Sequence, residues 1–214
     1  MTLPLTPDEL LTTTRSVRKR LDLDRPVPME LIRETLEVAL QAPTGSNLQG
    51  WHWIVVTDAE LKAQIGAYYK ESFDSYRNSS GYATRAAMGS EERQAATVRV
   101  GASSVYLSEV MGQVPVLVLA CITASAELPN GNQAGLWGSL LPAAWSFQLA
   151  ARARGLGTAW TTLHLKYEQE ISELLGIPPN VRQGVLLPTA YFTGETFKPA
   201  HREPLDNVLH VDRW

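Results

Sequence analysis

Cysteine and net charge are both scarce in this chain of 214 residues. It has one cysteine, Cys121, and a formal net charge of -3 at pH 7. A lone cysteine cannot form an internal disulfide. Because Cys121 lies in the apolar run Val114–Ile122, which is typical of a buried strand, core packing explains it better than redox chemistry does.

Long apolar runs and a broad basic surface are also missing. No run of about 18 apolar residues is present, and the N-terminus lacks the basic and apolar regions of a signal peptide. We therefore expect a soluble, cytoplasmic protein with no membrane partner. The pI is about 5.8, so nucleic acid is not an expected partner either, because binding a polyanion needs a broad basic face.

Motifs of several common sites are absent or incomplete. Gly45–Gly50 has the glycine spacing of a P-loop, but Trp51 follows where that motif needs Lys and then Ser or Thr. No Gly-x-Gly-x-x-Gly follows a strand pattern and no Gly-x-Ser-x-Gly occurs, so neither a Rossmann dinucleotide site nor an α/β-hydrolase triad is indicated. With four histidines, one cysteine and no close acidic pairing, a metal site has little support.

A single domain over residues 1–214 fits the length and the hydrophobic content of 44%. Apolar periodicity and capping residues predict helices at 6–14, 28–43, from 58, 139–154 and 167–175, and strands at 53–56, 116–122, 158–163 and 185–191. This order predicts an α+β domain. Pro142 is tolerable only in a first helical turn, which supports a start at Ser139, and Pro188 indicates an edge strand or a bulge. The polar segment of about 70–112 indicates helical excursions that form a lid over the site.

The segment Pro43–Trp51 is the most informative stretch of the chain, since it connects a helix pattern to an apolar strand with small and amide-bearing residues. Pro43 and Gly45 favour turns that allow close approach of a ligand. Side chains that both donate and accept hydrogen bonds recur along it, at Thr44, Ser46, Asn47 and Gln49. The edge of a flavin ring, which alternates N–H and C=O groups, needs that mixture. An ordinary helix-to-strand connection is the alternative, because the same residue types are common in turns.

Four cations fall within six residues at Arg15–Arg20. Such a cluster can bind phosphate, because Arg provides forked donors and Ser16 a hydroxyl. A solvated helix end is the plainer interpretation, since Lys and Arg are favoured in the last turn of a helix.

The cationic run and the segment Pro43–Trp51 form an ordered set of motifs together with Gly155–Trp160 and His201–Pro204. On these motifs the chain resembles the FMN-dependent nitroreductase family from about Thr14 to Trp214, most weakly between about 59 and 112. The resemblance implies a central mixed, mostly antiparallel sheet flanked by helices, in an intertwined homodimer. The tail of about 195–214 would embrace the partner subunit.

The resemblance also assigns residues to FMN. The Arg-Ser-x-Arg run binds the phosphate and ribityl chain and places a cation by the ring, which implies Arg15, Ser16 and Arg18. The loop before the first strand contacts the ring and ribityl chain, which implies Pro43, Thr44, Ser46, Asn47 and Gln49. The segment after the Gly-Leu-Gly turn presents backbone groups to N5 and O4, which implies Trp160, Thr161, Thr162 and Leu163. An Arg two residues before a Pro closes on the phosphate, which implies Arg202.

Three positions depart from the family pattern. Thr14 stands where many members have a first Arg, and Arg20 stands where Phe is usual. Gly50 replaces the Pro that precedes the loop tryptophan. These differences bear on the phosphate contacts and on the stiffness of the loop.

The implied activity is hydride transfer from NADH or NADPH through FMN to a small oxidised acceptor, such as a quinone or a nitroaromatic. No acid or base of the protein is expected to be catalytic: Arg18 would favour the anionic reduced flavin, and a backbone N–H of Thr162 or Leu163 would orient N5. A flavin-binding protein without turnover is the alternative, and a reductive dehalogenase or flavin-degrading enzyme of the same fold is a third. His164 either donates to substrate or caps a strand end.

Overall fold

The computed structural model describes residues 2–86, 88–125, 127–128 and 130–214. Its centre is a four-stranded sheet in the order β1-β2-β4-β3, formed by β1 (Trp51–Val56), β2 (Val116–Thr123), β3 (Leu156–Thr158) and β4 (Val181–Tyr191). All three strand pairs are antiparallel, and a bridge between Ser16 and Thr158 adds a parallel contact. The predicted α+β class with a mostly antiparallel sheet is confirmed.

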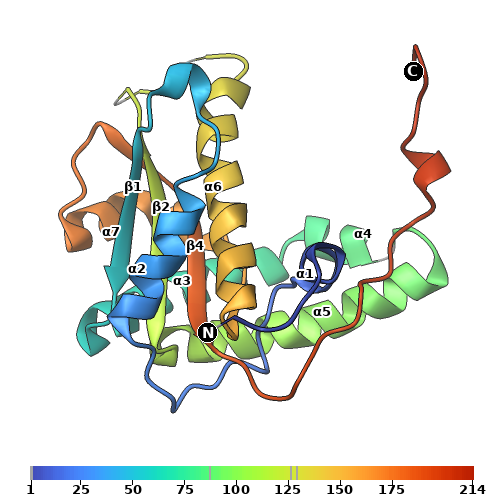
Figure 1. The fold of residues 1–214 in the computed structure, drawn as a ribbon, viewed down its shortest axis with the longest axis horizontal. Helices are drawn as coiled ribbons and strands as arrows, with labels where there is room; N and C mark the ends of the chain where they lie inside the picture. The colour runs from blue at the N-terminus through green and yellow to red at the C-terminus, as the bar shows by residue number, and fades with distance from the viewer. Residues whose placement is uncertain (1, 87, 126, 129) are drawn as a thin grey trace.

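Helices cover both faces of this sheet (Figure 1). They are α1 (Pro7–Thr13), α2 (Met29–Ala39), α3 (Ala59–Arg77), α4 (Ser80–Ala86), α5 (Glu91–Val110), α6 (Ala134–Ala153) and α7 (Glu168–Leu175). Single turns of 3-10 helix occur at η1 (Gly45–Asn47), η2 (Met111–Gln113), η3 (Leu163–Tyr167) and η4 (Leu205–Asn207). None of the helices in the described ranges is long and apolar enough to cross a membrane.

Local capping chemistry sets several helix ends where the sequence predicts them. Thr6 and Glu9 form a reciprocal capping box at the start of α1. The Asp58 side chain accepts hydrogen bonds from two backbone N–H groups at the start of α3. Gly176 ends α7 with a left-handed φ of 66°.

Two hydrophobic cores lie on opposite faces of the sheet, because successive side chains of β2 alternate between them. Leu117, Leu119 and Cys121 pack with α3, α5 and α7, whereas the residues between them pack with α2 and α6. Cys121 is fully buried, and burial raises the pKa of its thiol to about 12. The interpretation of Cys121 as a core residue is confirmed.

The predicted start of α6 at Ser139 is wrong. The helix begins at Ala134, so Pro142 lies inside it rather than in its first turn. A proline ring there meets the carbonyl of the residue four positions earlier and removes one hydrogen bond. Trp137 and Leu140 both pack in the core on this face of the sheet, so tertiary packing extends the helix in spite of that cost.

Two strand predictions also need correction. The strand expected at 158–163 ends at Thr158, after which Thr161 makes one bridge to Leu186 before η3 begins. Pro188 lies on an inner strand rather than an edge, because β4 runs between β2 and β3. Pro188 O accepts from Ala159 N at 3.4 Å, just past the last paired residue of β3, so the missing N–H on that side costs no bond of the strand pairing. The bulge lies instead at Gly184, where the register with β2 shifts between Ala120 and Cys121.

The bulge glycine allows α6 to pack closely on the sheet. A Cβ at Gly184 would run into Leu140 Cδ2 and lie 3.4 Å from the Trp137 ring. Because Leu140 is fully buried and cannot swing away, Gly184→Ala should lower the free energy of unfolding by about 1–3 kcal/mol. Urea unfolding measures this change. Gly135→Ala is the control, since a Cβ there meets nothing within 4 Å and alanine favours the helix; equal stability of both variants would contradict the prediction.

Candidate functional site

The N-terminal cationic segment is held against β3 by backbone pairing. Val17 N donates to Thr158 O at 2.7 Å, and the Val17 side chain is buried in the core. The approach is possible because Gly157 has no side chain: a Cβ there would lie 3.0 Å from Val17 Cβ. The neighbouring side chains of Arg15, Ser16 and Arg18 line a cavity.

This cationic cavity has a volume of about 660 Å³ and gathers residues from across the sequence. Its lining includes five residues that the sequence predicts for the site: Arg15, Ser16, Arg18, Trp160 and Arg202. Three of them carry guanidinium groups, and no Asp or Glu stands among the lining residues in the described part of the chain. A cavity of this charge suits an anion such as a phosphate.

A second cavity of about 410 Å³ shares Arg18, Val100 and Trp160 with the first. Thr161 and Leu163 line it, and its walls are aromatic, from Tyr69, Phe73, Tyr76, Tyr82 and Trp160. Tyr76 and Tyr82 meet edge to face, with ring centroids 5.3 Å apart. The two cavities therefore offer a cationic end and an aromatic end to one elongated ligand.

Arg18 and Tyr69 face this shared region and influence each other's ionisation. Burial lowers the pKa of Arg18, and Tyr69 opposes that change. Burial raises the pKa of Tyr69 to about 12, with Arg18 acting in the opposite direction. At neutral pH the site therefore holds a guanidinium cation and a protonated phenol that can donate a hydrogen bond.

The loop that contains Pro43, Thr44, Ser46, Asn47 and Gln49 lines neither cavity. Gly45 N donates to Ser139 Oγ at 3.0 Å, and Trp51 Nε1 donates to Ser139 O at 2.6 Å, so the loop packs near the beginning of α6. The cationic cavity contacts α6 at Trp145 and Gln148, about 9 and 14 Å farther along the helix axis. Figure 1 shows η1 at one end of α6, away from α1. Within one chain the two groups of predicted residues do not meet.

The same loop holds a strained and exposed conformation. Ser46, Asn47 and Gln49 have left-handed φ values of 51°, 54° and 48°. Such values cost about 1–3 kcal/mol each for ordinary residues, and less for Asn. Gln49 Nε2 donates to Asn47 Oδ1 at 2.9 Å, which fixes the two amide side chains relative to each other. Strain of this kind at exposed polar groups is typical of a binding loop.

Two predicted residues near η3 have other surroundings. Thr162 precedes η3 and does not line either cavity. His164 is 0% exposed, and neither ring nitrogen has a hydrogen-bond partner among the described residues. Burial lowers the pKa of His164 to about 3, so the ring is neutral. The ring therefore caps no strand end in the described structure, and its full burial leaves a substrate no access to it.

Gln148 is a site residue that the sequence reasoning missed. It is 2% exposed, and its Nε2 donates to Thr158 Oγ1 at 2.8 Å. Gln148 lines the cationic cavity, and its buried Oε1 has no hydrogen-bond partner among the described residues. An unpaired buried acceptor is costly, so a ligand N–H or O–H at this point would be stabilising. The signal in the sequence is an amide within the apolar stretch Leu140–Ala151.

The family to which the chain belongs follows from sequence comparison. A model of the Nitroreductase family matches residues 11–191, which include the cationic segment, the strained loop and all four strands. The chain is a member of the nitroreductase family. The predicted resemblance is confirmed.

Two curated relatives of this nitroreductase-family chain are named for different activities. A protein of Methanothermobacter thermautotrophicus with the provisional name NADH dehydrogenase/NAD(P)H nitroreductase is 26% identical over 211 residues, which cover 96% of this chain and 86% of the relative. Rat iodotyrosine deiodinase 1 is 29% identical over 205 residues, which cover 94% of this chain and 67% of the relative.

A solved structure shares the fold. The FMN-dependent nitroreductase NfnB from Mycobacterium smegmatis, in complex with NADPH, superposes with a TM-score of 0.69 at 20% identity. The match covers 96% of this chain and 97% of that one. The sheet and the helices on its two faces are therefore those of a nitroreductase fold.

The contact of Gly157 with Val17 gives a test of how the site is held. Gly157→Ala should push the segment 15–18 away from β3 and lower the free energy of unfolding by about 1–2 kcal/mol. Combined with Val17→Ala, which removes two of the three crowding atoms, Cγ1 and Cγ2, the loss should be smaller than the sum of the two single losses. Urea unfolding of the four proteins gives the coupling, and strictly additive losses would disprove the close approach.

Proposed function

We propose that this nitroreductase-family protein binds FMN and uses it to pass two electrons from NADH or NADPH to a small oxidised acceptor. The observation that carries the proposal is the pair of joined cavities, with three guanidinium groups at one end and five aromatic rings at the other. FMN has one phosphate, a polar ribityl chain and a flat ring in the same linear order. The structural neighbour NfnB is an FMN-dependent nitroreductase whose structure is a complex with NADPH, which supports the same pairing of cofactor and electron donor.

The residues of the cationic cavity fit the phosphate and the ribityl chain. Arg15 and Arg202 would hold the phosphate as forked donors, together with the hydroxyl of Ser16. Gln148 Oε1, the unpaired acceptor, would receive a hydrogen bond from a ribityl hydroxyl. The ring would lie toward Trp160, Thr161 and Leu163.

When bound, FMN supplies the chemistry of hydride acceptance and hydride donation. The protein would orient the ring, exclude water and stabilise charge. Arg18, which lines both cavities, would stabilise negative charge on the reduced ring. Parts of α3, α4 and α5 line the aromatic cavity and would act as the lid.

The strained loop would complete the site of a second subunit. Its amides are exposed and free to meet a ligand, yet the cavity of its own chain lies about 9–14 Å along α6, at Trp145 and Gln148. The C-terminal arm offers the surface for such a dimer, because it leaves the body of the molecule (Figure 1). Its apolar side chains are exposed, namely Leu205, Val208, Leu209, Val211 and Trp214. A homodimer in which each FMN contacts both chains would use the loop and bury the arm.

Reductive dehalogenation of an aromatic amino acid is a second candidate, supported by the similarity to iodotyrosine deiodinase 1. The lining of the aromatic cavity favours acceptors without an ammonium group. Over the described chain that lining contains Arg18 but no Asp or Glu. A nitroaromatic or a quinone needs no such carboxylate.

The first test is a spectrum of the purified protein. We expect a flavin absorbance that bleaches when NADH or NADPH is added without oxygen and returns when a nitroaromatic or quinone is added. Mass spectrometry of the released chromophore should identify FMN. If 3-iodotyrosine restored the spectrum and the other acceptors did not, dehalogenation would be the better assignment. Recovery of FAD, or of protein that does not bind added FMN, would end the proposal.

Mixed dimers test the shared site. Homodimers of Arg202→Ala and homodimers of Asn47→Ala/Gln49→Ala should both bind FMN more weakly than the wild type does. For Arg202→Ala the loss should be about 1.5–3 kcal/mol, because a hydrogen bond to the charged phosphate is removed. Coexpression with two different tags yields a mixed dimer. One of its two sites then combines an intact cavity with an intact loop, so half of the sites should bind FMN with wild-type affinity. If cavity and loop of one chain served the same site, the mixed dimer would have no intact site.

A further inference from the structure

Arg20 belongs to the N-terminal cationic run, but it does not line the proposed cofactor site. It binds instead the beginning of the C-terminal arm, residues 192–198, which we call the arm base. Arg20 Nε donates to Thr193 O at 2.6 Å, and Arg20 Nη1 donates to Thr196 O at 2.8 Å. Thr193 N in turn donates to Arg20 O at 2.9 Å. Arg20 therefore spans the turn of the arm base with its side chain and its backbone.

Two aromatic rings of the arm base contact two guanidinium groups. Phe192 and Phe197 lie with ring centroids 4.9 Å apart. Arg20 Cζ is 4.1 Å from the Phe197 centroid, and Arg152 Cζ is 5.0 Å from both centroids. Each contact has the geometry of a cation–π interaction. The arm base is thus held by α6, through Arg152, as well as by the N-terminal segment.

Arg152 has no other described partner that would explain a buried charge. It is 2% exposed, and none of its three guanidinium nitrogens has a hydrogen-bond partner among the described residues. Burial lowers its pKa, and the nearby charge of Arg20 adds to that effect. The rings of Phe192 and Phe197 are therefore its stabilising environment.

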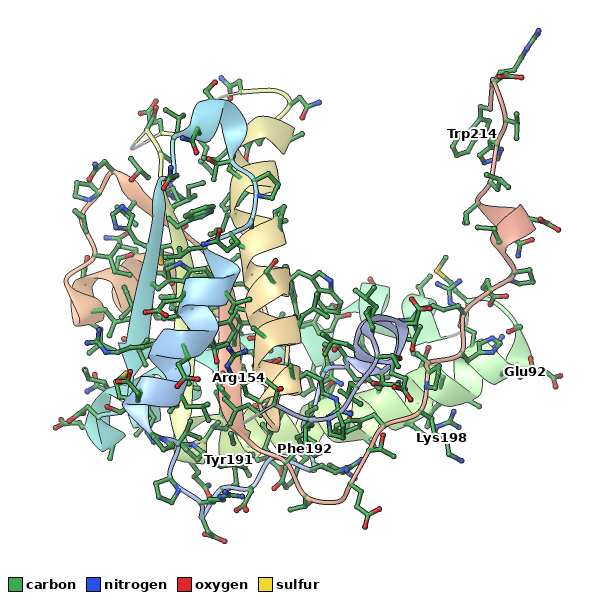
Figure 2. All side chains as sticks on the ribbon, in the orientation of Figure 1. Glu92, Arg154, Tyr191, Phe192, Lys198 and Trp214 are labelled. Atoms are coloured by element: carbon green, nitrogen blue, oxygen red, sulfur yellow. The ribbon has the colours of Figure 1, made fainter. Side chains whose placement is uncertain are left out.

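Gly194 and Arg15 complete the attachment. Gly194 has a φ of 80°, and a Cβ there would lie 2.7 Å from Arg20 Nη2, so only glycine leaves room for the guanidinium. Arg15 Nη1 donates to Lys198 O at 2.7 Å. Figure 2 shows Phe192 and Lys198 at the two ends of this attached strip, with Trp214 far beyond it.

The attached strip ends just before the arm enters the cationic cavity. Pro199, Ala200 and Arg202 line that cavity, so the arm base is directly followed by the residues that would meet the phosphate. A short segment fixed at its start has less conformational freedom to lose when its Arg binds a ligand. Fixing the arm base therefore favours the position of Arg202 at the cavity.

We propose that Arg20, assisted by Arg152, clamps the arm base and thereby positions Arg202 for the FMN phosphate. Arg20 is a positioning residue in this scheme, since it acts through the arm and not on the ligand. The inference rests on the proposed function, because it needs FMN in the cationic cavity.

FMN affinity of the full-length protein, measured by flavin fluorescence, tests the clamp. Arg20→Ala should weaken binding roughly tenfold or more, the scale of a lost charged hydrogen bond. Arg20→Lys should fall between this variant and the wild type, because an ammonium keeps the charge but lacks the fork. Arg25→Ala is the matched control: its guanidinium carbon lies 3.5 Å from the Tyr191 ring, directly before the arm base, and its loss should leave the affinity unchanged.

A double-variant cycle separates positioning from a general loss of structure. In protein that already carries Arg202→Ala, the further change Arg20→Ala should not weaken FMN binding again. An equal loss in both backgrounds would overturn the proposal, because Arg20 would then act independently of Arg202. If Arg20→Ala does not fold, Arg20→Lys is used in the same cycle.

Hydrogen exchange gives a readout that does not depend on FMN. The Thr193 amide, which donates to Arg20 O, should exchange faster in Arg20→Ala and Arg20→Lys than in the wild type or in Arg25→Ala. Unchanged exchange would show that no clamp exists. If the wild-type protein bound no FMN, the proposed function would fail, whereas this exchange experiment would still decide whether Arg20 holds the arm.

Discussion

The pairing of the N-terminal segment with β3 is the contact on which the site depends. Val17 can approach Gly157 because a side chain there would collide with it. Thr158 accepts two hydrogen bonds: its backbone O accepts from Val17 N, and its Oγ1 accepts from Gln148 Nε2. One short strand therefore contacts the cationic segment, the cavity amide of α6 and the end of β4, where Leu156 pairs with Tyr191 directly before the arm.

The parts of the fold that follow local rules could be predicted from the sequence. The capping box of Thr6, the cap of Asp58 and the left-handed stop at Gly176 each involve atoms a few residues apart. The errors lie where distant contacts override local preference. Pro142 stays inside α6 because the helix is held by packing on the sheet, and Pro188 stays on an inner strand because its neighbour β3 is short.

The site, like the fold, could be predicted from the sequence only in part. The motifs that carry the family resemblance include five residues of the cationic cavity, namely Arg15, Ser16, Arg18, Trp160 and Arg202. They include Trp160, Thr161 and Leu163 on one side of the aromatic cavity but miss the tyrosines, since Tyr69 and Tyr82 come together only through the arrangement of α3, α4 and α5. They also cannot show that the loop at Asn47 lies at the other end of α6, which depends on how that helix crosses the sheet.

Several unfavourable features of the isolated chain point to the contacts that would relieve them. The Gln148 amide oxygen has no partner among the described residues, three loop residues hold left-handed φ values, and the arm exposes Trp214 completely. Each feature alone costs a small part of the stability of a domain, but together they would make a costly arrangement for a chain that acts alone. A hydroxyl-bearing ligand would relieve the first. A second copy of the chain would relieve the third and would bring the strained loop to the ligand. The proposed ligand and the proposed second subunit would thus address all three features, and under that proposal cofactor binding and dimer formation would be one coupled equilibrium.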